Sequence, residues 1–132
     1  MEPEISVIVP LRDESQNVSL LAQRILQTFD QSKPRIEIIL VDDGSTDDTW
    51  QQIMKACRND PRLRGLRHVR NAGQSAALWT GFQASHAPVI ATLDGDLQND
   101  PADFPGMLKL LADSDMVCGV RTKRAEDRKS VV

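Results

Sequence analysis

The sequence predicts an α/β fold: a mainly parallel sheet with helices on both faces. Three short apolar runs of strand length, at residues 5–9, 36–41 and 87–93, supply the first observation. The second is that apolar residues between these runs recur at three- and four-residue spacing, as on one face of a helix. The third is their regular alternation, which favours parallel strands joined by crossover helices.

The first half of the chain supplies two strands and two helices. Residues 5–9 form the first strand, and Pro10 is expected to end it. Residues 36–41 form the second strand. The helix between these strands has an apolar stripe of Val18, Leu21, Ala22, Ile25 and Phe29. The helix after the second strand carries Trp50, Ile53, Met54 and Cys57 on one face, with Ser45 or Thr46 as its expected N-cap.

The second half continues the alternation. Residues 63–69 form a weaker strand, interrupted by charges, which is expected at an edge of the sheet. Residues 73–85 are Ala-rich and helical, and residues 87–93 form the clearest strand. The packing face expected for this helix comprises Leu78, Gly81 and Phe82.

A last helix and a last strand are expected near the end of the chain. Asp100 has the character of an N-cap, and Pro101 would occupy the first helical position. Residues 115–120 are expected to form a short final strand. The apolar stripe of the helix comprises Phe104, Met107, Leu108 and Leu111.

Composition indicates one globular domain at residues 1–120, followed by a basic tail at 121–132. Hydrophobic residues make up 40% of the chain and charged residues 27%, and the net charge of −3 argues against nucleic-acid binding. No apolar run approaches the ~20 residues of a membrane helix. The N-terminus also lacks the pattern of a signal peptide, so the chain as given is expected to be cytoplasmic.

Asp94-Gly95-Asp96 is the most informative motif, because it follows the strand at 87–93. In open parallel sheets, ligands bind beyond the carboxyl ends of the strands. Two carboxylates there repel each other and favour a cation, and Mg²⁺ or Mn²⁺ shared with phosphates suits such an oxygen-rich site. Gln98 would add an amide oxygen. The alternative interpretation is a simple turn, since Asp and Gly are common turn residues.

A second acidic pair, Asp42 and Asp43, follows the strand at 36–41. A carboxylate at such a strand end can accept hydrogen bonds from a nucleoside, and Asp43 is the preferred candidate. Helix capping by the Gly44-Ser45 segment is the alternative, although capping does not account for two adjacent acids.

Three further segments lie at expected strand ends. Pro10 and Glu14 belong to the loop after the first strand, where a nucleotide contact competes with a helix-dipole role for Glu14. Asn71 and Gly73 precede a helix. They either contact the nucleotide ligand that would donate a sugar, called the donor below, or serve only ordinary loop geometry. Arg121 follows the last strand and could hold a phosphate with its planar guanidinium group.

Several enzyme classes lack their usual motifs in this chain. There is no G-x-x-x-x-G-K-[ST] phosphate loop, no G-x-G-x-x-G fingerprint and no G-x-S-x-G nucleophile elbow. A receiver-like domain would want acids after the first strand, where this chain has proline. A sugar nucleotidyltransferase would want a Gly-rich basic loop at the same place.

Taken together, these motifs resemble the N-terminal part of family 2 glycosyltransferases of GT-A fold. Within that family the chain most resembles polyprenyl-phosphate glycosyltransferases, the group that contains dolichol-phosphate mannosyltransferase. The matching segments are Ser6-Val7-Ile8-Val9-Pro10 with Glu14, Val41-Asp42-Asp43-Gly44-Ser45-Thr46-Asp47, Asn71-Ala72-Gly73, Leu93-Asp94-Gly95-Asp96-Leu97-Gln98 with Pro101, and Gly119-Val120-Arg121.

The resemblance implies a Rossmann-like GT-A domain and an inverting transfer of a hexose from a UDP- or GDP-sugar to a polyprenyl phosphate. It implies that Asp43, and also Asp42 and Glu14, contact the nucleoside. Asp94 and Asp96 would be the catalytic acids that, with Gln98, hold Mg²⁺ or Mn²⁺ against the diphosphate. Arg121 would meet a phosphate. A full-length parent would work at the cytoplasmic face of a membrane.

The chain is shorter than is usual in this family, and it is expected to be truncated on its C-terminal side. It is therefore expected to bind the donor without necessarily completing the reaction. Two alternatives remain: a non-catalytic α/β module that binds nucleotide or metal, and a family 2 enzyme that acts on a sugar hydroxyl.

Overall fold

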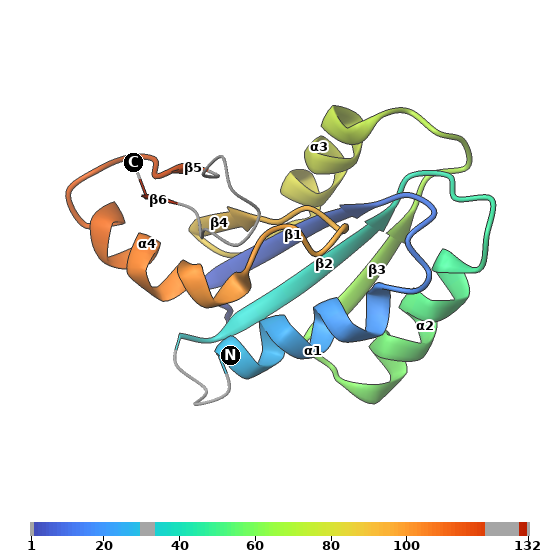
Figure 1. The fold of residues 1–132 in the computed structure, drawn as a ribbon, viewed down its shortest axis with the longest axis horizontal. Coiled ribbons are helices and arrows are strands. Elements are labelled where there is room, and N and C mark those ends of the chain that lie inside the picture. Colours follow the sequence, from blue (N-terminus) through green and yellow to red (C-terminus); the bar gives the residue numbers. More distant parts are fainter. Residues whose placement is uncertain (1, 30–33, 121–129, 132) are drawn as a thin grey trace. The chain divides into compact units, whose positions relative to one another are not determined.

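The computed structural model describes residues 2–29, 34–120 and 130–131, and the chain divides into two compact units at 1–101 and 102–132. The first unit contains a parallel four-stranded sheet in the order β3-β2-β1-β4 (Figure 1). Its elements are β1 Ile5–Leu11, α1 Val18–Thr28, β2 Ile36–Asp42, α2 Thr49–Asn59, β3 Leu63–Arg67, α3 Gln74–Ala84 and β4 Val89–Thr92.

Helices cover both faces of this sheet, as the sequence predicts. On one face, Ala77 of α3 lies in a buried cluster formed with Ile8, Ile39 and Val41. On the other face, Gly65 of β3 lies against the side chains of Trp50 and Ile53 of α2, and α1 packs beside α2. The strands β1 and β2 are buried along their whole length, which is typical of strands covered on both sides.

Close packing of α3 on β1 requires a small residue at position 81. A Cβ atom built on Gly81 would lie 2.4 Å from Ile8 Cγ2. Gly81 therefore belongs to the packing face, as predicted. The prediction for Phe82 is wrong: its side chain is 52% exposed and stacks on the ring of Trp79, which is also exposed.

Pro10 lies inside β1, whereas the sequence pattern suggested that it ends the strand. The carbonyl of Ile8 accepts from Leu93 on the β4 side, and that of Leu11 accepts from Asp43 on the β2 side. Residue 10 therefore faces the β4 side. Because proline has no N–H to donate, the ladder with β4 ends at the Ile8–Thr92 pair, while the ladder with β2 continues through Leu11.

The outer strands differ from each other in how well the sequence anticipated them. β3 is an edge strand, as predicted. β4 comprises only Val89–Thr92 and is half-buried. The strand is therefore shorter and less buried than the sequence pattern at 87–93 predicted.

A polar cluster joins the strands near their amino ends. The buried carboxylate of Glu37 accepts hydrogen bonds from Ser6 Oγ, at 2.5 Å, and from the backbone N–H of His86, at 2.6 Å. Arg64 Nη1 lies 2.9 Å from Glu37 Oε1 and also donates to the carbonyl of Ala84. These donors hold the pKa of Glu37 below its ordinary value even though burial opposes this. The cluster ties the loop before β4 to the other three strands.

A short 3-10 helix, η1 Pro101–Asp103, begins at the last residue of the first unit and leads into α4 Phe104–Leu111 of the second. Pro101 begins this helical segment, as predicted. The N-cap of α4, however, is Asp103 and not Asp100, because the 3-10 turn displaces the start of the α-helix. The expected strand at 115–120 is reduced to β5 Gly119–Val120. It pairs antiparallel with β6 Ser130–Val131 in a separate sheet.

Within the described residues, no helix has both the length and the apolar character needed to span a bilayer.

Candidate functional site

The acidic loops of the first unit lie at the carboxyl end of its sheet, where the strand order reverses. The chain runs from β1 outward through β2 to β3 and then returns to β4 on the other side of β1. Such a reversal opens a crevice between two loops that leave in opposite directions, and open α/β sheets bind ligands there. The loops after β1 and β4 flank this point. Gly95 approaches β1 so closely that a Cβ atom there would lie 2.3 Å from Leu11 Cδ2.

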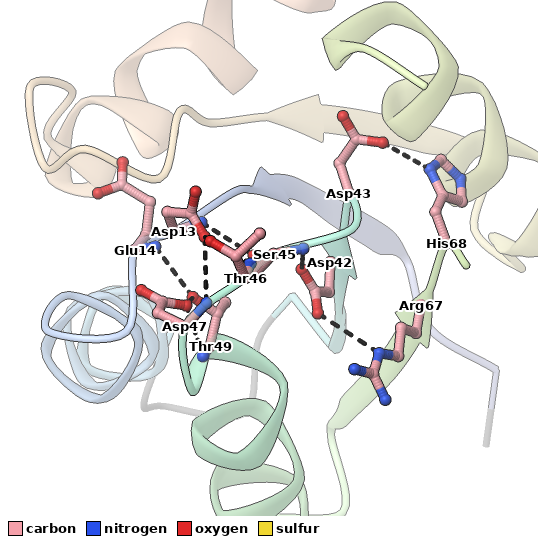
Figure 2. A network of polar contacts seen from close by, with 10 residues as sticks. All are labelled: Asp13, Glu14, Asp42, Asp43, Ser45, Thr46, Asp47, Thr49, Arg67 and His68. Carbon is pink, nitrogen blue, oxygen red and sulfur yellow. Dashed lines mark hydrogen bonds and ion pairs between the residues drawn. The ribbon is translucent and has the colours of Figure 1, made fainter. Parts of the chain in front are cut away.

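Asp13 joins the loop after β1 to the loop after β2 (Figure 2). Its Oδ1 atom accepts the backbone N–H of Thr46 at 2.8 Å and that of Asp47 at 3.3 Å. In return, the Asp13 N–H donates to Ser45 Oγ at 2.9 Å. Asp13 has a φ of 52°, a left-handed conformation that Asp and Asn adopt more readily than most residues. The two loops are thus fixed to each other.

This connection also explains where α2 begins. The sequence pattern suggested Ser45 or Thr46 as N-cap, but the N-cap is Asp48. Ser45 Oγ and the Thr46 N–H are engaged with Asp13, so the helix starts at Thr49. The hydroxyl of Thr49 accepts the N–H of Glu14 at 3.0 Å, which adds a further bond between the loops.

Asp42, the last residue of β2, is completely buried. Its Oδ1 atom accepts the N–H of Ser45 at 3.0 Å, and Arg67 Nε lies 3.8 Å from its Oδ2 atom. Oδ2 has no hydrogen-bond partner. The guanidinium group of Arg67 also lies over the ring of Trp50, 5.6 Å from its centroid. Asp42 therefore shapes the loop beneath the surface of the crevice.

Asp43 is nearly buried and holds the loop between β3 and α3. Its Oδ1 atom accepts the Ala72 N–H at 2.8 Å, and its Oδ2 atom accepts the Gly73 N–H at 2.9 Å. His68 Nδ1 lies 2.8 Å from Oδ1. Burial alone would raise the pKa of Asp43, but these donors together hold it below its ordinary value. The side chain is therefore an oriented carboxylate at neutral pH.

His68 contacts the candidate site residue Asp43, and the sequence reasoning assigned it no role. Its ring bridges Asp43 and Thr80, with Nε2 lying 2.8 Å from Thr80 Oγ1. The available signal was its position directly after β3, at the same sheet edge as the acidic pairs. The bridge fixes α3 relative to the end of β2.

Asp94 and Asp96 follow β4, as predicted. Asp94 Oδ1 accepts from Gln74 Nε2 at 2.9 Å, and the Asp94 N–H donates to Asn99 Oδ1 at 3.3 Å. Asp96 Oδ1 accepts the Gln98 N–H at 3.0 Å, and both Asp96 and Gln98 are exposed. Leu97 has a φ of 63°, which turns the chain sharply between them. The interactions described for this loop leave the other carboxylate oxygens available to an external ligand.

The pKa of Glu14 shows that the surroundings of the loop after β1 are negatively charged. Burial raises the pKa of Glu14, and the charges of Asp96, Asp47 and Asp13 raise it further, against a lowering hydrogen bond from Asn17. Asp96 from the β4 loop is therefore electrostatically close to Glu14 from the β1 loop. The charges that act on Glu14 are all negative, which favours binding of a cation.

The remaining predicted residues have mixed outcomes. Gly73 has a φ of 103° and begins the turn into α3, and Asn71 is exposed, with its Oδ1 accepting the Gly73 N–H at 3.2 Å. Arg121 lies outside the described residues. Across the described part of the chain, no group of three or more His, Cys, Asp or Glu side chains is arranged to hold a metal by itself.

Sheet order and helix placement define an open α/β domain with acidic loops at the carboxyl ends of its strands. The chain belongs to glycosyl transferase family 2, whose sequence profile matches residues 6–131.

Curated relatives carry the likeness across nearly the whole chain. Dodecaprenyl-phosphate galacturonate synthase of Rhizobium johnstonii is 40% identical over 126 residues, which are 93% of this chain and 37% of the relative. An undecaprenyl-phosphate 4-deoxy-4-formamido-L-arabinose transferase of Pseudomonas syringae is 37% identical, over 92% of this chain and 37% of the relative. The chain thus spans little more than a third of the length of these proteins.

Solved structures confirm the GT-A type of fold. A mannosyltransferase from Pyrobaculum calidifontis, in complex with GDP-Man and Mn²⁺, superposes with a TM-score of 0.78 at 23% identity, over 94% of this chain and 36% of that one. Glucosyl-3-phosphoglycerate synthase of Mycobacterium tuberculosis, with Mn²⁺ and UDP, gives 0.65 at 24% identity, over 83% and 39%.

Proposed function

We propose that this chain is the donor-binding part of an inverting, metal-dependent glycosyltransferase that moves a hexose from a UDP- or GDP-sugar to a polyprenyl phosphate. The observation that carries the proposal is the placement of acidic loops after β1 and β4 on either side of the reversal of strand order, with the charge of Asp96 helping to raise the pKa of Glu14. The polyprenyl-phosphate acceptors named for the curated relatives support the choice of acceptor.

The residues after β4 fit a divalent cation. Asp94, Asp96 and Gln98 offer only hard oxygen ligands, which Mg²⁺ and Mn²⁺ prefer. Asp94, Asp96 and Gln98 by themselves are too few ligands for a closed metal cage, so a cation held there would share its coordination with a diphosphate. When bound, the cation would act as a Lewis acid that stabilises the negative charge of the leaving nucleoside diphosphate.

The nucleoside is assigned to the loops after β1 and β2. Asp43 Oδ2 has one protein donor, so it keeps capacity to accept a second N–H or a hydroxyl from the ligand. The residues assigned to the same nucleoside site, beside Asp43, are Pro10, Glu14, Asn71 and Gly73. Asp42 is assigned a structural role, because it is completely buried beneath the loop.

A phosphate acceptor would not require a strong general base in the site. The second pKa of a phosphate monoester is about 6, so the acceptor oxygen is already largely ionised at neutral pH. Arg121 is assigned to a phosphate of donor or acceptor. With a lipid-linked acceptor, the full-length protein would work at the cytoplasmic face of a membrane.

Binding of donor and metal without turnover is a second candidate for the chain as given. It is favoured by one observation: the chain spans about 37% of the length of its curated relatives.

Calorimetric titration tests the donor site directly. UDP-glucose and GDP-mannose are titrated into the protein with and without Mn²⁺, and one of them is expected to bind in a metal-dependent manner. Asp96→Asn should remove the metal dependence. Glu4→Gln, the same chemical change in an exposed ion pair with Arg35, should leave it unchanged. A folded protein that binds neither nucleotide sugar would refute the donor-site assignment.

A further inference from the structure

Gln74 makes a specific contact with the acidic loop after β4. Gln74 is the first residue of α3, and its Nε2 atom donates to Asp94 Oδ1 at 2.9 Å. Gln74 is exposed and Asp94 is half-buried, so this hydrogen bond is accessible to solvent. A bond so exposed contributes little to folding, because water competes for both partners.

The backbone that presents Gln74 is fixed by Asp43. Both carboxylate oxygens of Asp43 take part: Oδ1 accepts the Ala72 N–H and Oδ2 accepts the Gly73 N–H. Gly73 then turns into the helix at a φ of 103°, a conformation that favours glycine. A Cβ atom at position 73 would meet nothing within 4 Å, so the backbone angle, and not the available space, selects glycine there.

The helix itself is held by His68, whose ring joins Asp43 to Thr80 one and a half turns further along α3. Asp43 therefore controls both the turn before Gln74 and the seating of the helix that carries it. Two hydrogen bonds, joined by the backbone of Gly73 and Gln74 and the Gln74 side chain, thus connect Asp43 to Asp94.

We infer that Gln74 is a positioning residue for the proposed metal site at Asp94. We also infer that the path from Asp43 through Gln74 couples the proposed nucleoside site at Asp43 to Asp94. The inference rests on the proposed function, since it takes Asp94 as a ligand of the cation. By donating to Oδ1, the amide of Gln74 sets the rotation of the carboxylate and leaves Oδ2 for the cation. Residues that orient a metal ligand in this way typically contribute 10- to 100-fold to metal affinity.

Mn²⁺ binding tests this role, measured by calorimetry in the absence of nucleotide and again in the presence of UDP or GDP, with protein-free nucleotide as the blank. Gln74→Ala is expected to weaken Mn²⁺ binding about tenfold. Gln83→Ala, the same change at an exposed position of the same helix, should leave Mn²⁺ affinity unchanged. Gln74→Asn keeps an amide but shortens its reach, and it should weaken Mn²⁺ binding to a similar extent. Thermal unfolding of all three variants should match the wild type.

The outcomes separate this inference from the proposed function. If Asp96→Asn abolishes Mn²⁺ binding while both Gln74 variants keep wild-type affinity, the positioning role is overturned and the metal site stands. If the wild-type protein binds no Mn²⁺ either alone or with UDP or GDP present, both the metal part of the proposed function and this inference are refuted. Equal weakening in the Gln74 and Gln83 variants would also overturn the positioning role, because the loss would then not be specific to the contact with Asp94.

Discussion

Asp13 and Thr46 are joined by two hydrogen bonds to a single oxygen, although they lie 33 residues apart. Oδ1 of Asp13 accepts both the N–H and the hydroxyl of Thr46, at 2.8 Å and 3.2 Å. The loops after β1 and β2 therefore form one rigid wall of the proposed donor site. A rigid wall lowers the entropy cost of binding a nucleotide.

Removing the side chain of Asp13 should loosen this wall. Asp13→Ala is expected to cost about 1 kcal/mol of unfolding free energy, because the N–H groups of Thr46 and Asp47 lose their acceptor. Asp13→Asn keeps an acceptor oxygen and tolerates the left-handed backbone, so it should stay close to the wild type. Asp13→Gly also lacks the acceptor but relieves the left-handed backbone, so comparing it with Asp13→Ala in urea unfolding separates backbone strain from loss of the acceptor. If Asp13→Ala is as stable as Asp13→Asn, the acceptor role is refuted.

Glu14 should make stability depend on pH in an unusual direction. Its pKa in the folded protein is raised above the ordinary value of 4.5, by burial first and then by neighbouring carboxylates. Folding therefore favours the protonated form, and ionisation at neutral pH costs stability. Glu14→Gln should raise the Tm at pH 7, and the gain should vanish at or below pH 4. A gain that grows as the pH falls would contradict this sign.

Asp43 should show the opposite dependence. Its pKa is lowered from 3.8, so its contribution to stability is present above that pH and is lost as the pH falls through the folded-state value. Asp43→Asn is expected to cost about 1–3 kcal/mol at pH 7, since an amide cannot accept from both Ala72 and Gly73. The difference from wild type should shrink towards pH 3. Asp48→Asn, at an exposed acid nearby, serves as the control.

Gly44 should tolerate no side chain. It has a φ of 68°, and a Cβ atom would lie 2.4 Å from the backbone nitrogen of Asn71. Gly44→Ala is expected to cost about 2–4 kcal/mol through the clash and the backbone strain together. Gly106→Ala is the matched control, because nothing lies within 4 Å of its Cβ position, and alanine stabilises helices relative to glycine. Chemical denaturation of both variants decides the comparison.

The sequence alone predicted what depends on local pattern. Alternating strand and helix periods gave the parallel sheet, and the position of Asp94 and Asp96 after an apolar run gave the acidic strand end. Both are properties of neighbouring residues. The roles of these acids as ligands stay a prediction, which the titrations above test.

What the sequence could not give depends on partners distant in the chain. Ser45 and Thr46 looked like helix caps because their actual partner, Asp13, lies in another loop. Pro10 looked like a strand end because proline does end the ladder with β4, whereas the continued pairing with β2 depends on a strand elsewhere in the chain. His68 had its position directly after β3 as its only signal, and its contacts with Asp43 and Thr80 depend on residues of other elements.

The buried cluster around Glu37 has a practical consequence for protein engineering. It joins Ser6, Arg64 and His86 near the amino ends of the strands, whereas the acidic loops follow the carboxyl ends of the same strands. Cohesion of the domain and chemistry of the site are thus assigned to opposite poles of one sheet. Stabilising substitutions near the amino ends of the strands and specificity-changing substitutions near the carboxyl ends should therefore have nearly additive effects, because the two sets of residues are distant from each other.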